Sequence, residues 1–139
     1  MLWRPAYQTL VARDLILPPI PFGSDIQILI GAFGFHAMRE MSLWRRLVEA
    51  DASHTHWAQA FFFSHPGSRE AEVLDSMVPA SQRDRTFIGT DIEEAWRNLV
   101  QPDRPEQSFA AVISGNQAKI MMKGIPTEDA WDAFLKELD

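Results

Sequence analysis

Residues 25–35 read DIQILIGAFGF, and this stretch decides the fold of the chain. It is almost entirely apolar, contains Gly31 and Gly34, and has no charge after Asp25. Such a run, β-branched near its start and aromatic near its end, is typical of a strand buried on both faces. We therefore expect a central strand over about 26–33, with helices on both faces of its sheet. A functional site would lie where this strand passes into the next helix.

The composition limits the classes of protein to which the chain can belong. Its 139 residues predict one domain with a core of its own. The net charge of −6 argues against nucleic acid or an anionic membrane surface as the partner. The absence of cysteine excludes disulfides, thiolate metal sites and cysteine nucleophiles. It fits a reducing compartment, the cytoplasm or an organelle matrix, and the sequence shows no signal peptide and no membrane span.

Apolar spacing and turn residues predict the remaining helices and strands. We expect a helix over 37–50, a strand over 57–64, a helix over 69–78, a short strand over 86–88, a helix over 91–101, hairpin strands over 108–113 and 118–123, and a last helix from about 127. Gly115-Asn116 between two apolar runs predicts a two-residue hairpin turn with glycine first. In the 69–78 helix, Val73, Leu74, Met77 and Val78 are expected to point inward.

The N-terminal residues 1–24 are interpreted as a lead-in arm that packs on the edge of a domain spanning 25–139. Leu10, Val11 and Leu15 have helical spacing, which predicts a short helix over 6–17. Three prolines between positions 18 and 21 end any regular element there. The alternative is an arm that binds a partner.

The predicted order of elements resembles the thioredoxin fold over residues 25–139. The first two strands need a right-handed crossover and therefore lie parallel, whereas the last two form an antiparallel hairpin. The fold class is thus α/β and thioredoxin-like, with a mixed central sheet, helices on both faces, and a C-terminal β-hairpin followed by a helix.

This resemblance also indicates where a site would lie. Redox-active members carry Cys-x-x-Cys at the start of the helix after the central strand, where free backbone donors lower the thiol pKa. Residues 34–39 of this chain read GFHAMR and contain no thiol. The resemblance therefore implies a redox-inactive protein whose partner-binding face includes His36, Ala37, Met38 and Arg39. A proline usually precedes the hairpin in this fold, and Pro105 is the nearest candidate.

Three short stretches are similar to the ATP10 family of mitochondrial ATP-synthase assembly factors. They are FHAMREM at 35–41 with Trp44 and Glu49-Ala50 after it, Phe-x-Gly-x-Asp at 87–91, and QAKI at 117–120 followed by Gly124 and by PTE at 126–128. The chain departs from that family at Met121 and Met122, where the family tends to have arginine and tryptophan. This resemblance implies a non-catalytic chaperone or assembly factor with a protein client or complex subunit as partner, including a membrane protein. It implies no cofactor.

Two alternatives use the histidines. His36, at a helix N-terminus, could act as an acid or base in a non-cysteine enzyme or contact a small ligand. His54 and His56 have the spacing at which two strand residues face the same side and grip one metal ion. The alternative without a function is that His54 and His56 are exposed histidines of a polar turn and that His36 is a partly exposed histidine near a helix cap.

Methionines and arginines supply the last candidate surfaces. Methionine adapts to varied apolar shapes, so Met38, Met41, Met77, Met121 and Met122 could form a surface for a client. At helical spacing, however, we expect Met38, Met41 and Met77 to belong to the core. Met121 and Met122 are adjacent on a strand and point to opposite faces, so we expect one of them to be exposed. Arg39, Arg45 and Arg46 form a basic patch in an acidic chain. This patch is either a solvated helix face or a site for an acidic partner.

Overall fold

The structure is a computed structural model that describes residues 8–18, 26–34, 37–50, 56–63, 69–89, 93–103, 106–126 and 128–138. Its elements are, in order, β1 (Gln8–Ile16), β2 (Ile28–Phe33), α1 (Met38–Ala50), β3 (Trp57–Phe62), α2 (Arg69–Met77), the 3₁₀ helix η2 (Ala80–Arg85), β4 (Thr86–Gly89), α3 (Glu93–Val100), β5 (Ser108–Ser114), β6 (Gln117–Gly124) and α4 (Glu128–Leu138). The predicted helices and strands from β2 onward are confirmed within a few residues at their ends.

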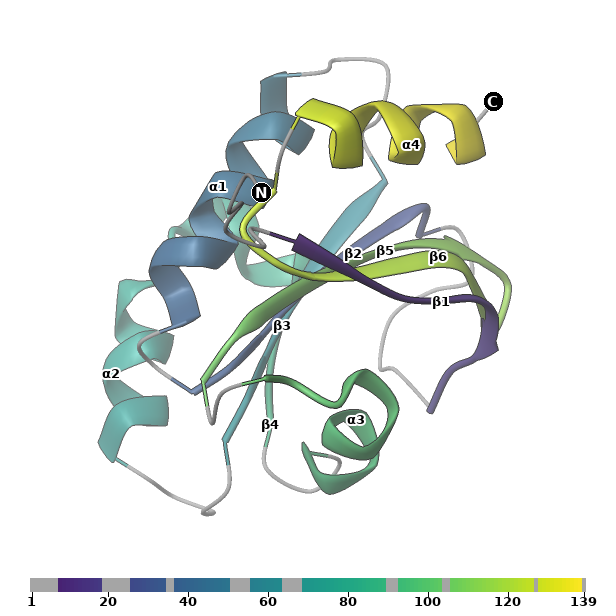
Figure 1. The fold of residues 1–139 in the computed structure, drawn as a ribbon. Helices are drawn as coiled ribbons and strands as arrows, with labels where there is room; N and C mark the ends of the chain where they lie inside the picture. Colours follow the sequence, from purple (N-terminus) through teal and green to yellow (C-terminus); the bar gives the residue numbers. More distant parts are fainter. Residues whose placement is uncertain are drawn as a thin grey trace, which may run out of the picture.

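The strands form one mixed six-stranded sheet in the order β1-β6-β5-β2-β3-β4 (Figure 1). β2, β3 and β4 are parallel, and β5 pairs antiparallel with β2. The hairpin β5–β6 is antiparallel, and Ser114 faces Gln117 across a turn in which Gly115 has a φ of 63°. This conformation favours glycine, so the predicted turn is confirmed.

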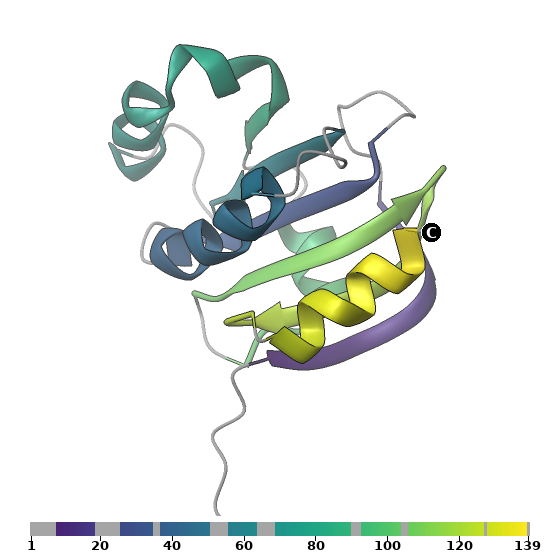
Figure 2. The same ribbon diagram turned by 90° about the horizontal axis from the view of Figure 1, so that it is seen from above.

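Helices cover both faces of the sheet, as expected from the buried central strand. α1, α2 and α4 contact one face and α3 lies on the other, which Figures 1 and 2 show from two directions. Residues of β2 alternate between the two cores: Ile28 and Ile30 belong to the first, and Leu29 and Phe33 to the second. All six residues of β2 are buried.

The helix predicted over 6–17 is wrong, because Gln8–Ile16 form strand β1 at the edge of the sheet. β1 pairs antiparallel with β6, so the lead-in extends the sheet. The register shifts between Leu10 and Ala12, which leaves Val11 as an extra residue, and Asp14 has a positive φ of 57°. A bulge interrupts the alternation of a strand, which explains why the sequence does not show a period of two here.

Two expectations about the burial of apolar residues are wrong in part. Met121 and Met122 do lie in opposite cores, but both are buried, because helices cover both faces of β6. In α2 only Leu74 has a buried side chain among the described residues, and Val78 is buried just after the helix. Val73 and Met77 are 41% and 53% exposed. α2 lies at the β4 edge of the sheet, so only a narrow stripe of this helix is covered.

Candidate functional site

Two of the predicted site residues line a surface groove. Met38 and Arg39 belong to the first turn of α1 and form one end of its wall. Ala37 precedes them but is buried, so its side chain presents no surface to a partner. His36 and Pro105 lie outside the described residues, and the predictions that rest on them stay predictions.

The groove lies between α1 and α2 and has a volume of about 380 Å³. Most of its wall is apolar, with Met38 on the α1 side, Leu74 and Met77 on the α2 side, and Phe61 of β3 beneath. The described residues that line it are Met38, Arg39, Ser42, Arg45, Gln59, Phe61, Leu74, Met77, Val78, Pro79 and Gln82. The groove is therefore built from α1, β3 and the consecutive helices α2 and η2.

A buried glutamine forms the polar part of the floor. Gln59 is 1% exposed and lies in the middle of β3, flanked by Ala58 and Ala60. Its Nε2 donates to Thr86 Oγ1 at 2.9 Å and to Gln82 Oε1 at 3.2 Å, and its Oε1 accepts from Arg45 Nη1 at 3.2 Å. The carboxamide thus has partners for both donor hydrogens and one lone pair, as a buried amide requires.

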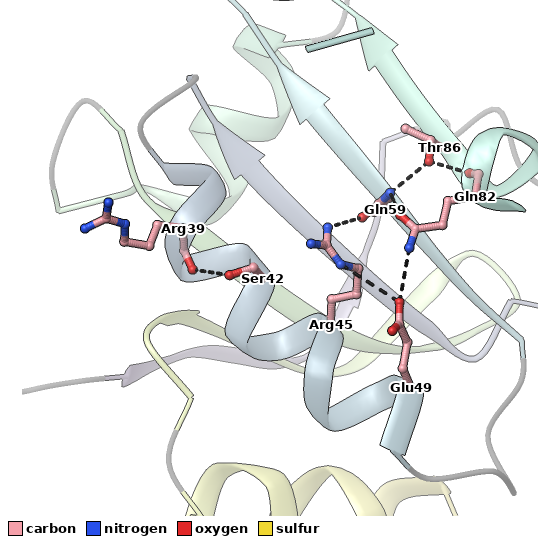
Figure 3. A network of polar contacts seen from close by, with 7 residues as sticks. All are labelled: Arg39, Ser42, Arg45, Glu49, Gln59, Gln82 and Thr86. Carbon is pink, nitrogen blue, oxygen red and sulfur yellow. Dashed lines mark hydrogen bonds and ion pairs between the residues drawn. The ribbon is translucent and has the colours of Figure 1, made fainter. Parts of the chain in front are cut away.

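These contacts belong to a ring of side chains that joins α1 to η2 (Figure 3). Gln82 Nε2 donates to Glu49 Oε1 at 3.2 Å, and the same carboxylate oxygen lies 3.9 Å from Arg45 Nε. The ring therefore runs from Gln59 to Arg45, Glu49, Gln82 and back to Gln59. Because it fixes the segment after α2 against α1, we infer that it sets the width of the groove.

The two arginines of the groove differ in their pairing. Arg45 is committed to Gln59 and Glu49, whereas Arg39 is exposed and points away from the ring in Figure 3. Among the described residues, no carboxylate pairs with the Arg39 guanidinium. Arg39 and Arg45 are also the charged side chains among the described lining residues. Because Glu49 lies beside Arg45, the guanidinium of Arg39 is the unbalanced positive charge among the described lining residues, in a chain of net charge −6.

A second polar cluster fixes α1 beside this groove. Trp44 Nε1 donates to the carbonyl oxygen of Gly124 at 2.8 Å, and Ser108 Oγ donates to the same oxygen at 3.2 Å. Ser108 N and Oγ lie 3.3 and 3.1 Å from Glu40 Oε1. The first two turns of α1 are thus tied to β5 and β6, so the wall that holds Met38 and Arg39 is rigidly placed.

The arrangement suits recognition of a flexible apolar segment. Methionine side chains adapt to varied apolar shapes, and this groove has one on each wall. The polar groups of the floor are occupied with one another, so what the groove presents to a ligand is apolar surface and the guanidinium of Arg39.

The structure gives little support to a metal site at His54 and His56. His56 is exposed and His54 lies outside the described residues. Within the part of the chain that the structure describes, no three histidine, aspartate or glutamate side chains are grouped closely enough to hold a metal ion. None of the described helices combines the length and the apolar composition that crossing a bilayer requires.

Sequence reasoning found Met38 and Arg39, and it considered Met77 as a client contact but favoured burial of this residue in the core; it missed the floor. The signal for Gln59 was present, because it is the one polar residue within WAQAFF, the sequence of β3. Gln82 and Thr86 carried no comparable signal, since the 3₁₀ helix η2 after Pro79 was not expected.

Comparison of the chain with protein-family models, with curated proteins and with solved structures gave no significant match.

Proposed function

We propose that this protein is a redox-inactive, thioredoxin-like assembly factor or chaperone that holds a segment of a protein client in the groove between α1 and α2. The observation that carries the proposal is the pair of methionines, Met38 and Met77, on opposite walls of an open apolar groove. Met77 is 53% exposed although it is a large apolar side chain. Exposed apolar surface of this kind, gathered in a concave site, is typical of interaction surfaces.

The thioredoxin-like part of the proposal is supported by the strand arrangement. Parallel β2 and β3 lie beside the antiparallel hairpin β5–β6, with α1 and α4 on one face and α3 on the other. The parallel pair and the hairpin have the directions expected from the resemblance, and the short strand expected over 86–88 is β4 at one edge; β1, at the other edge, is an addition to that pattern. The groove begins at the first turn of α1, beside the position that a dithiol occupies in redox-active proteins of that fold.

The assembly role is supported by the absence of cysteine and by the resemblance to assembly factors. A chain without cysteine cannot exchange disulfides, so a retained binding face without its nucleophile fits capture of a client rather than turnover. The resemblance to ATP-synthase assembly factors points to a subunit of a membrane complex as the client and to an organelle matrix as the compartment.

Site-specific photo-crosslinking tests the proposal. A photoreactive phenylalanine analogue replaces Met77 in one variant and Val73 in a matched control, since both are exposed apolar residues of α2 but only Met77 lines the groove. In native extract we expect one discrete client to be crosslinked from position 77 and not from position 73. Equal crosslinking from both positions, or none from either, would contradict the proposal.

A further inference from the structure

We infer that the segment held in the groove carries a carboxylate beside its apolar side chains, and that Arg39 binds this carboxylate. The inference rests on the proposed function and adds the chemistry of the client. Of the three arginines of the basic patch, it assigns Arg39 alone to an acidic partner, because Arg45 is paired within the ring and Arg46 is not among the described residues that line the groove.

The distribution of charge around the groove is the first argument. The chain as a whole is acidic, with 19 acidic and 13 basic residues. The described residues that line the groove nevertheless include two arginines and no carboxylate. Charges of opposite sign across an interface set its specificity, so a positive groove selects an acidic segment.

The difference between the two arginines is the second argument. Arg45 already has a carboxamide and a carboxylate as neighbours, so its charge is largely balanced within the ring. Among the described residues, the side-chain hydrogen bond that involves Arg39 goes to its backbone: Ser42 Oγ donates to the Arg39 carbonyl oxygen at 2.6 Å. The guanidinium of Arg39 is therefore the group that remains available for an anion, and its planar donors suit a carboxylate.

The position of Arg39 supplies the third argument. It shares the first turn of α1 with Met38, so the cation and one methionine wall lie side by side. An acidic residue within a turn of an apolar residue in the client can therefore reach both at once. An amphipathic segment with glutamates flanking a leucine and methionine stripe has this chemistry.

Defined peptides test the inference. Three amphipathic peptides share one stripe of leucine and methionine and carry glutamate, glutamine or lysine at the flanking positions, and their dissociation constants are measured by fluorescence anisotropy. We expect the glutamate peptide to bind roughly fivefold more tightly than the glutamine peptide, and the lysine peptide to bind most weakly. The preference should weaken as salt is raised, because the Debye length falls to about 3 Å at 1 M.

Two charge-reversal variants locate the effect. Arg39→Glu is expected to reverse the order, so that the lysine peptide becomes the tightest. Arg46→Glu is the matched control, since Arg46 is an exposed arginine of the same helix and is not among the described lining residues. It should change each dissociation constant by less than about twofold, as expected for a surface charge outside the site.

The outcomes separate this inference from the proposed function. If all three peptides bind equally, or none binds while position 77 still crosslinks a client, the acidic chemistry is wrong and the groove remains a client site. If position 77 crosslinks nothing, the proposed function itself fails. Sedimentation of the protein alone adds a check: a dimer that Met77→Gln dissociates would make a second copy the occupant and overturn the inference.

Discussion

The two faces of the sheet are built differently, although β3 contributes to both. Toward α3 it presents Ala58, Ala60 and Phe62, and the rings there stack into a closed apolar cluster in which Trp96 lies 5.4 Å from Phe62 and 5.8 Å from Phe109, centroid to centroid. Toward α1 and α2 it presents Trp57, Gln59 and Phe61, and the layer opens into the groove. One face thus serves stability, and we propose that the other combines stability with binding.

The largest effect is expected from breaking the closed face. Trp96→Ala removes a fully buried ring that packs between α3 and the sheet, and such truncations lower the free energy of unfolding by about 3–5 kcal/mol. Chemical denaturation measures it. Peptide binding by the fraction that stays folded should be unchanged, because Trp96 does not line the groove.

Trp96→Phe is the matched control for that experiment. Trp96 Nε1 is buried and has no hydrogen-bond partner among the residues that the structure describes, so its loss leaves none of their acceptors unpaired. The phenylalanine variant should therefore be clearly more stable than the alanine variant. A loss below about 1 kcal/mol for Trp96→Ala would show that the α3 face is not the main source of stability.

The sequence predicted the closed parts of this molecule better than the open parts. Strand β2 is an unbroken apolar run, β3 is interrupted only by Gln59, and α1 has a regular stripe at Met41, Trp44 and Val48, so burial leaves a direct pattern in the order of residues. The turn at Gly115 was also predictable, because its conformation depends on neighbouring residues in the sequence. β1 was missed because its pairing with β6 is a long-range contact and its bulge hides the alternation.

The candidate site was predicted only where it is local. Met38 and Arg39 follow the central strand directly, and the resemblance placed a binding face there. The remainder of the groove comes from Gln59, Gln82 and the exposed side of α2, which tertiary packing brings together. Val73 and Met77 were expected to be buried because helical spacing reports an apolar face, but it cannot report how much of that face another layer covers.

An intermediate effect is expected at the polar floor of the groove, on the open face. Gln59→Ala removes the centre of the ring and leaves Arg45, Gln82 and Thr86 each without one partner, so the free energy of unfolding should fall by about 1–3 kcal/mol. Gln117→Ala is the control, an exposed glutamine of β6, and it should change stability by less than about 0.5 kcal/mol. Denaturation of both variants gives the comparison.

Gln59→Ala also tests whether the ring sets the width of the groove. If it does, affinity for the glutamate peptide should fall, although the amide of Gln59 is hydrogen-bonded to Arg45, Gln82 and Thr86. Unchanged affinity with lowered stability would show that the ring has a purely structural role. Gln59 would then contribute to stability and not to binding, like the residues of the closed face.

The smallest effect on stability should accompany a clear effect on binding. Met77→Gln keeps the length of the side chain and replaces an exposed thioether at the end of α2, so the free energy of unfolding should change by less than about 0.5 kcal/mol. Burial of about half of a methionine side chain against a client is worth roughly 1 kcal/mol, which corresponds to about fivefold weaker binding. Val73→Gln, at the other exposed apolar position of α2, should change neither quantity. Equal loss of binding in both variants would extend the contact surface across the whole exposed side of α2. Loss confined to Met77 would show that the open face binds through the groove, and that a residue of this face can contribute to binding with little effect on stability.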